Sequence, residues 1–310
     1  MRQEKKMKKQ KFQMAIADRI FDVAVKLFVI LLFVITLYPI IFVISASVSD
    51  PSLVSAGKML LFPKGFTLDG YSKLLEYKEI WLGYVNTFFY TIVGTTLNLL
   101  VTLPCAYALS RDELKGRNAI MKIFAFTMYF GGGLIPSFLN VRDLGLYNTR
   151  TILLVLGLVS TYNLIVARTF FASSIPKELQ ESAMLDGASD FIILRKVVLP
   201  LSKSIISVLA LYYGVGHWNS YFTPMVYLED RSKFPLQVFL KEILTQTQVA
   251  MNSMSGSEST AAVIEMLQKQ DTANLLKYAL IIVSSLPLMI IYPFLQKHFE
   301  KGVMLGSIKG

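Results

Sequence analysis

Long apolar runs alternate with short polar segments along almost the whole chain. A helix that crosses a membrane needs about 20 mostly apolar residues, and six runs reach this length. We therefore expect an all-α, polytopic membrane protein with six transmembrane helices. The six segments are Ile20–Ala46, Tyr84–Leu109, Ala119–Asn140, Thr151–Phe171, Ser204–Leu228 and Ala273–Gln296.

Composition agrees with a membrane protein. Of 310 residues, 54% are hydrophobic and 17% charged, whereas soluble domains carry about 25% charged residues. The formal charge of +10 lies in short basic segments between apolar runs, a pattern that membrane topology explains and a nucleic-acid groove does not. The single cysteine, Cys105, excludes an internal disulfide, and two distant histidines, His217 and His298, indicate no metal site.

The basic residues indicate an orientation. The larger share of the 31 lysines and arginines lies in segments on the same side of the membrane as the N-terminus. The positive-inside rule therefore predicts that both termini are cytoplasmic. We expect a basic cytoplasmic tail at 1–19, a six-helix domain at 20–297 and a cytoplasmic tail at 298–310. A cytoplasmic loop, 176–203, joins helices four and five, and an outer loop covers 229–272.

The loop 176–203 is polar and rich in small residues. Glu178 and Glu181 suit the first turn of a helix, whose dipole favours negative charge, and Gly187 suits its left-handed end. Small residues such as Ser182 and Ala183 let another surface approach closely. The residues alone leave open a docking helix or an amphipathic loop on lipid headgroups.

The pattern Glu181-Ser182-Ala183, then Gly187, then Leu199-Pro200 resembles the EAA loop of ABC importer permeases. Ser182 stands where the family usually has its first alanine. The resemblance implies that this loop is the coupling helix, which docks on a cytoplasmic ATPase. It assigns that contact to Glu178, Glu181, Ser182, Ala183, Asp186 and Gly187.

The resemblance continues through three further segments. "HWNSYFTPMVYL", 217–228, is similar to the fifth span of sugar-type permeases, and 128–149 resembles the third span of a subgroup that imports larger oligosaccharides. The segment 295–310 is similar to the C-terminus of maltose-type permeases. That similarity implies a tail that contacts the ATPase through Met304, Gly306, Lys309 and Gly310.

Neutral polar and aromatic side chains occur within the second and fifth expected spans. Amides and hydroxyls can hold membrane helices together, and Tyr and Trp also anchor spans at the interface. Such groups equally suit an uncharged, polyhydroxylated ligand, so both interpretations stay open. The candidate substrate pathway comprises Asn86, Tyr212, Tyr213, His217, Trp218, Asn219 and Tyr221.

Enzyme motifs are missing from the sequence. It contains no G-x-x-x-x-G-K-[ST] for a nucleotide and no G-x-S-x-G or H-E-x-x-H. We expect no catalytic residue and no cofactor on this chain, with ATP and magnesium held by a partner ATPase. A proton-driven carrier would need a buried carboxylate, and the interiors of the second and fourth expected spans hold none.

The resemblance implies a permease subunit of an ATP-driven, binding-protein-dependent ABC importer for a sugar or complex oligosaccharide, in the cytoplasmic membrane of a bacterium. The implied partners are a second homologous permease subunit, two ABC ATPases and an extracellular solute-binding protein, which a segment of the outer loop, 252–260, would contact. A secondary carrier and a non-transporting membrane scaffold are the alternatives. The identity of the sugar stays open, as does the share of substrate contacts on this chain.

Overall fold

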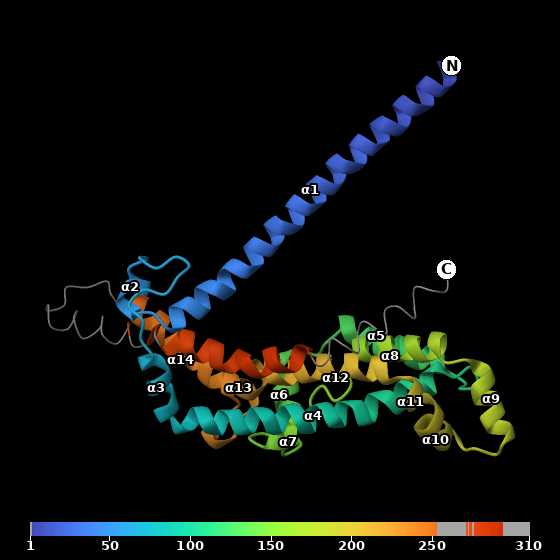
Figure 1. Cartoon of the computed structure of the whole chain (residues 1–310). Coiled ribbons are helices and arrows are strands. Elements are labelled where there is room, and N and C mark those ends of the chain that lie inside the picture. Colours follow the sequence, from blue (N-terminus) through green and yellow to red (C-terminus); the bar gives the residue numbers. More distant parts are fainter. Residues whose placement is uncertain (1, 253–270, 272, 275, 294–310) are drawn as a thin grey trace. The chain divides into compact units, whose positions relative to one another are not determined.

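Every secondary-structure element in the described part of the chain is a helix, which confirms the all-α prediction. The chain divides into two compact units, one formed by 1–73 with 250–282 and the other by 74–249 with 283–310 (Figure 1). The computed structural model describes residues 2–252, 271, 273, 274 and 276–293.

The first unit contains α1 (Arg2–Ser47), α2 (Pro51–Ser55) and the beginning of α3 (Asp69–Glu76). The part of α1 from Asp18 to Ser47 is long and apolar enough to cross a membrane, and the run from Leu27 to Ala46 holds no charged residue. A helix that is hydrophobic all round suits a lipid environment. The chain after α1 folds back on its end, where the Ser45 hydroxyl donates to the Leu61 carbonyl at 2.6 Å.

The second unit is organised around α4 (Lys78–Ser110), which packs along α12 and α8 (Figure 1). The remaining helices of this unit are α5 Arg117–Tyr129, α6 Leu134–Asp143, α7 Arg150–Val155, α8 Thr161–Ser174, α9 Lys177–Leu185, α10 Asp190–Ile193, the π-helix η1 Leu194–Val198, α11 Leu199–Leu201, α12 Lys203–Trp218, α13 Phe222–Tyr227 and the 3₁₀-helix η2 Arg231–Lys233. Two more helices, α14 Leu236–Asn252 and the C-terminal helix Leu276–Pro293, belong partly to each unit.

Continuous spans are fewer than the sequence predicted. Among the described residues, three helices are long and apolar enough to cross a membrane, and α5 with α6 makes a fourth if this bent pair counts as one crossing. The three are Asp18–Ser47, Lys78–Ser110 and Leu276–Pro293.

Two expected continuous helices are interrupted near their middle or end. The expected span Ala119–Asn140 is occupied by α5 and α6, which meet at 114°, with Gly133 at φ +86° between them. The expected span Ser204–Leu228 is likewise interrupted, since α12 ends at Trp218 and α13 begins only at Phe222.

The expected helix Thr151–Phe171 is broken as well. Gly157 adopts φ +78° between α7 and α8, a conformation that a glycine reaches without steric cost. The Ser160 hydroxyl then caps α8 by accepting from the Asn163 backbone N–H at 3.4 Å. We call residues 156–160 the α7–α8 break.

Side chains of α4 hydrogen-bond the backbone that these interruptions expose. The Asn98 amide donates to the Leu158 carbonyl in the α7–α8 break at 2.7 Å. The Asn86 amide donates to the carbonyls of Ser232 and Phe234 at 2.8 and 3.0 Å. An unsatisfied backbone group costs several kcal/mol in an apolar medium, so these two amides stabilise irregular segments that could not otherwise pack there.

Hydroxyl groups of α4 act in the same way. Thr87 accepts from the Leu236 backbone N–H at 2.9 Å, and the Tyr90 phenol donates to the Lys233 carbonyl at 2.9 Å. Most polar groups of the second expected span therefore hydrogen-bond neighbouring segments of the protein. This is the first of the two interpretations left open by the sequence, the other being binding of a ligand.

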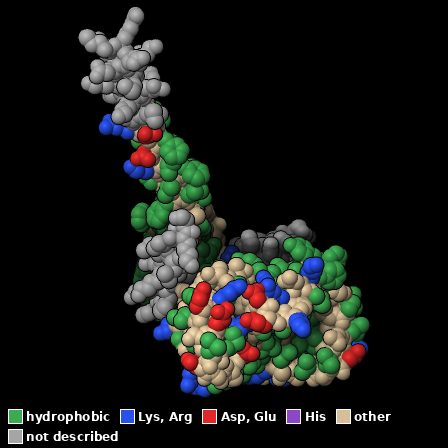
Figure 2. Space-filling model, turned by 90° about the vertical axis from the view of Figure 1, so that its right-hand side faces the viewer, with side chains coloured by type: hydrophobic (Ala, Val, Ile, Leu, Met, Phe, Trp, Pro, Cys, Tyr) green, Lys and Arg blue, Asp and Glu red, His purple; other side chains and the backbone are tan. Residues whose placement is uncertain are grey.

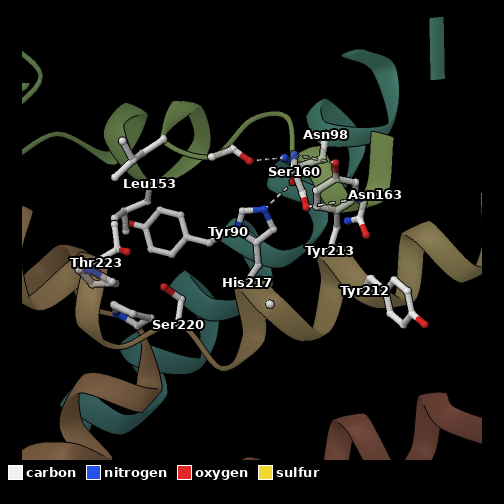
Figure 3. A pocket seen from close by; sticks show the side chains of 15 residues that line it. Tyr90, Asn98, Leu153, Ser160, Asn163, Tyr212, Tyr213, His217, Ser220 and Thr223 are labelled. Atoms are coloured by element: carbon white, nitrogen blue, oxygen red, sulfur yellow. Dashed lines mark hydrogen bonds between the residues drawn. The ribbon is translucent and has the colours of Figure 1, made fainter. Parts of the chain in front are cut away.

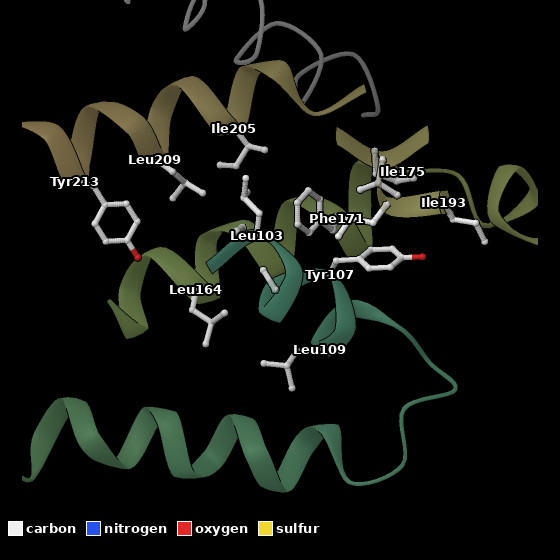
Figure 4. Packing of buried hydrophobic residues seen from close by; sticks show 14 residues of the cluster. Leu103, Tyr107, Leu109, Leu164, Phe171, Ile175, Ile193, Ile205, Leu209 and Tyr213 are labelled. Atoms are coloured by element: carbon white, nitrogen blue, oxygen red, sulfur yellow. The ribbon is translucent and has the colours of Figure 1, made fainter. Parts of the chain in front are cut away.

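An apolar cluster joins the other end of α4 to the segments that follow α8 (Figure 4). Tyr107 of α4 packs against Phe171 of α8, with ring centroids 6.5 Å apart. Ile193 and Val198, from α10 and η1, are completely buried in the same cluster. The loop between α8 and α12 is therefore seated on the membrane domain rather than hanging free.

We predict that Asn86→Leu destabilises the detergent-solubilised protein by about 1–3 kcal/mol, because two carbonyls lose their donor. The apparent melting temperature measures this. Thr96→Val is the matched control on α4, since the exposed Thr96 hydroxyl bonds only to the Ile92 carbonyl of its own helix. An unchanged melting temperature for Asn86→Leu would contradict the proposed role of this amide.

Candidate functional site

Helix α9 forms the central part of the loop between α8 and α12. Pro176 occupies its N-cap position. At its end, Gly187 has φ +79°, and the backbone N–H of Ala188 donates to the Ala183 carbonyl at 3.0 Å. This is the Schellman arrangement that ends many helices at a glycine, and it confirms the end predicted at Gly187.

The outer face of α9 and the turn after it expose both acidic and apolar groups. Leu185 is 89% exposed and Phe191 is 70% exposed. Figure 2 looks onto the end of the molecule where α9 and α10 lie, and acidic and basic side chains gather there among hydrophobic ones. Exposed apolar side chains surrounded by polar ones are typical of a protein-binding surface.

The inner face of α9 is fixed to the end of α4. Gln180 is only 7% exposed, and its side-chain oxygen accepts a hydrogen bond from the Arg111 guanidinium. Arg111 in turn lies over the Tyr107 ring, 5.8 Å from its centroid, and pairs with Glu113 at 3.1 Å. One arginine therefore connects α9, α4 and the loop that follows α4.

A second, exposed contact supports the start of α9. Asp112 forms an ion pair with Lys177 of α9 and another with Arg117 at 2.5 Å. The hydrogen bond from Lys177, and then that from Arg117, lowers the pKa of the Asp112 carboxyl. The pair therefore stays ionised at neutral pH, and its contribution is lost only as the pH falls through this lowered pKa.

A cavity of about 290 Å³ lies between α4, the α7–α8 break, α12 and α13 (Figure 3). The segments that line it include two interrupted helices, α7–α8 and α12–α13, and irregular backbone at membrane depth is tolerated where it lines a cavity. Its walls are formed by Tyr90, Asn98, Leu153, Leu156, Gly157, Ser160, Asn163, Tyr212, Tyr213, Gly216, His217, Ser220, Thr223, Pro224 and Pro235.

A hydrogen-bonded group joins three helices at this cavity. The Tyr213 phenol is 2.8 Å from the Thr102 hydroxyl and accepts from the Ser160 backbone N–H at 3.1 Å. His217 Nε2 is 2.7 Å from Asn98 Oδ1. Because the Asn98 nitrogen already donates to the α7–α8 break, its oxygen is the acceptor and His217 Nε2 carries the hydrogen. Figure 3 shows the contacts of His217 with Asn98 and of Ser160 with Tyr213 as dashed lines.

The structure separates the predicted pathway residues into two sets. Tyr212, Tyr213 and His217 line the cavity, whereas the other four lie outside its lining. Trp218 is 1% exposed and donates to the Ser284 carbonyl at 2.9 Å, and Asn86 is 0% exposed and bonds backbone carbonyls, as described above. The other two residues outside the lining are Asn219 and Tyr221.

The predicted coupling residues lie together on α9 and its end. Ala183 packs partly against the apolar cluster, and the other five are exposed: Glu178, Glu181, Ser182, Asp186 and Gly187. The predicted tail contacts, Met304, Gly306, Lys309 and Gly310, lie outside the described residues, as does most of the outer-loop segment 252–260.

Sequence reasoning missed several residues of both sites. Gln180 and Arg111 escaped notice because their partnership depends on the tertiary fold. Asn163 and Gly216 were treated as parts of uninterrupted spans, although the polar cluster from Ser160 to Asn163, following Gly157, is a helix-start signal.

The comparisons with known proteins agree with this architecture. Residues 80–305 match the family described as binding-protein-dependent transport system inner membrane component. The match covers most of the chain, so this protein belongs to that family, whose members are permease subunits of ABC importers.

Two individual relatives are similar to this chain along almost their whole length. The chain is 37% identical to the polygalacturonan/rhamnogalacturonan transport system permease protein YtcP of Bacillus subtilis (strain 168), over 94% of this chain and 99% of that protein. It is 36% identical to Protein LplC of the same organism, over 95% and 96% of the two chains.

A solved structure is also similar. It is described as a bacterial ABC transporter involved in the import of the acidic polysaccharide alginate. The TM-score is 0.79 with 35% sequence identity, and the alignment covers 91% of this chain and 98% of that chain. The relatives and this structure show that the chain is a transport component, an ABC importer permease, rather than an enzyme.

We predict that Gly187→Val loosens the end of α9, because a β-branched residue is strained at φ +79° by about 1–2 kcal/mol. The fraction of molecules in which the end of α9 is locally unfolded should therefore rise about 5–30-fold. Tryptic cleavage after Arg195 or Lys196 measures this fraction and should be faster in the variant. An added Cβ would meet no atom within 4 Å, so any effect reports backbone strain.

Gly187→Asn is the matched variant, since asparagine tolerates the left-handed conformation, and its cleavage rate should stay close to that of the wild type. Equal cleavage of Gly187→Val and the wild type would show that the turn does not depend on this backbone conformation.

Proposed function

We propose that this chain passes a complex oligosaccharide across the cytoplasmic membrane of a bacterium, as one of two permease subunits that work with two ABC ATPases and an extracellular solute-binding protein. The single observation that best supports this is α9, an exposed mixed surface held on the membrane domain by Arg111 and Gln180. The substrate class rests on the relatives, which are a polygalacturonan/rhamnogalacturonan permease and a transporter involved in the import of alginate.

The proposed topology has six crossings with both termini in the cytoplasm. In it, residues 1–19 and 298–310 are cytoplasmic tails of the permease domain 20–297, and the interrupted segments at 119–140, 151–171 and 204–228 cross as broken helices. The basic tail and α9 with its neighbours then lie on the same, cytoplasmic side, as the positive-inside rule requires.

The proposed coupling runs through α8. Its first turn adjoins the α7–α8 break at the cavity, and its last residue, Ser174, lies three positions before α9 begins at Lys177. Arg168 of α8 also donates to the Leu109 carbonyl of α4 at 2.9 Å. A movement of α9 on the ATPase would therefore reach the cavity through a short, continuous helix.

The remaining parts of the proposal concern partners. The ATPase holds ATP and magnesium, so this chain needs no cofactor, and the tail with Met304, Gly306, Lys309 and Gly310 reaches the ATPase as well. Since each chain offers one α9, a second permease provides the docking helix for the other ATPase. The outer loop 229–272 faces the binding protein.

We predict that Leu185→Glu weakens ATPase binding about 30-fold, the effect of losing an interface anchor worth about 2 kcal/mol. Leu185 is 89% exposed, so its replacement leaves the fold intact. The measurement is the amount of ATPase that co-purifies with the tagged permease pair.

Leu144→Glu is the control, an equally drastic change at a residue 64% exposed at the end of α6. It should keep the ATPase bound. Wild-type ATPase recovery and ATP-driven uptake by Leu185→Glu would overturn the proposed coupling surface, and uptake without any ATPase would favour a secondary carrier.

A further inference from the structure

The segment between α2 and α3 is hydrogen-bonded to the end of α1, within the first of the two units (Figure 1). We call residues 57–68 the α2–α3 loop. The Leu61 carbonyl accepts from the Ser45 hydroxyl, as described above. The Thr67 backbone N–H donates to the Val48 carbonyl at 3.0 Å. Both ends of the loop are therefore held at the level of the last residues of α1.

The charges along α1 indicate where this level lies in a membrane. No charged residue occurs between Lys26 and Asp50. At about 1.5 Å per residue, the uncharged run Leu27–Ala46 matches the roughly 30 Å thickness of the hydrocarbon core. Ser45 lies at the end of this run, so the loop bonded to it lies where the acyl chains meet the headgroups.

The polarity of this region is the reverse of that of a soluble domain. The hydroxyl residues Ser47 and Ser49 are 3% and 1% exposed, and both are hydrogen-bonded. On the outside of the loop, Leu60 is 70%, Phe62 80% and Phe66 72% exposed. Satisfied polar groups inside and apolar side chains outside suit apolar surroundings, and such an exposed apolar group marks a membrane or protein contact.

Two lysines alternate with these apolar side chains. Lys58 and Lys64 are exposed, and among the residues that the structure describes no carboxylate pairs with either of them. Long basic side chains keep their charge at the polar boundary while their stems lie on apolar surface, and Phe, Leu and Lys together are typical of elements that lie in the membrane interface. The depth of the loop favours lipid as its neighbour, because a soluble protein cannot reach side chains below the headgroups.

We propose that the α2–α3 loop is a lipid anchor in the membrane interface. Leu60, Phe62 and Phe66 enter the boundary of the acyl chains, and Lys58 and Lys64 pair with phospholipid phosphates. Because hydrogen bonds join the loop to α1, the anchor fixes the depth at which α1 leaves the membrane. In the topology proposed above this is the outer leaflet, but the anchor itself requires only that α1 crosses the membrane.

Fluorescence quenching by lipids tests the anchor in the full-length chain. Phe62→Cys and Phe66→Cys are each made in a Cys105→Ala background, which removes the single native cysteine, and are labelled with an environment-sensitive fluorophore. Both positions are exposed, so the label leaves the fold intact. The permease pair is placed in nanodiscs of phosphatidylethanolamine and phosphatidylglycerol. The quenchers are a lipid nitroxide near the headgroup, a lipid nitroxide near the end of the acyl chain, and iodide in the water.

Two further positions calibrate the measurement. Ile30 is 57% exposed and lies within the uncharged part of α1, so Ile30→Cys reports the acyl chains. Leu185 is 89% exposed at the end of α9, so Leu185→Cys reports water in nanodiscs that contain no ATPase.

We expect the nitroxide near the headgroup to quench the labels at 62 and 66 at least about threefold more strongly than the label at 185, because interfacial elements lie about 5–10 Å deep. Quenching at both positions by iodide alone would overturn the anchor and leave the loop free for a soluble partner. Labels that no quencher reaches would overturn it as well, since protein would then cover the loop. Transport is not measured, so either failure leaves the proposed function unchanged.

Discussion

The structure depends on one constraint, that backbone groups freed by a broken helix must find partners away from water. In an apolar medium each unsatisfied group costs several kcal/mol, and α4 provides most of the partners here. Asn98 of α4 and Tyr213 of α12 bond the α7–α8 break, while Asn86 and Tyr90 of α4 bond η2 and the residue that follows it. These bonds allow interrupted helices to exist, and the interruptions in turn create the cavity.

The same helix connects the cavity with the loop that contacts the ATPase in our proposal. The middle of α4 bonds the α7–α8 break, and its end presents Tyr107 and the adjoining Arg111, which hold α9 through Gln180. Helix α8 forms a second connection, since it begins at the break and ends just before α9. Helices α4 and α8 therefore each connect the cavity with α9. A transporter driven by a separate ATPase requires such a physical connection between its two sites.

The sequence allowed the helical class, the apolar α1 and α4, and the end of α9 at Gly187 to be predicted, because each has a local signal in length, apolarity or glycine. The breaks could not be predicted in the same way. Apolarity reports the environment of a segment and not its continuity, so Thr151–Phe171 looked like one span although Gly157 divides it. Side-chain partners such as Gln180 with Arg111, 69 positions apart, depend on the tertiary fold.

The most direct test of the central claim is hydrogen exchange of backbone amides in wild type and Asn98→Leu, read at residues 157–164 and 177–188. Local opening free energies govern this exchange. If α4 holds the break and the break is connected to α9 through α8, both segments should exchange faster in the variant, while α1 exchanges as before. Faster exchange confined to 157–164, or no change in either segment, would contradict the connection between the cavity and α9.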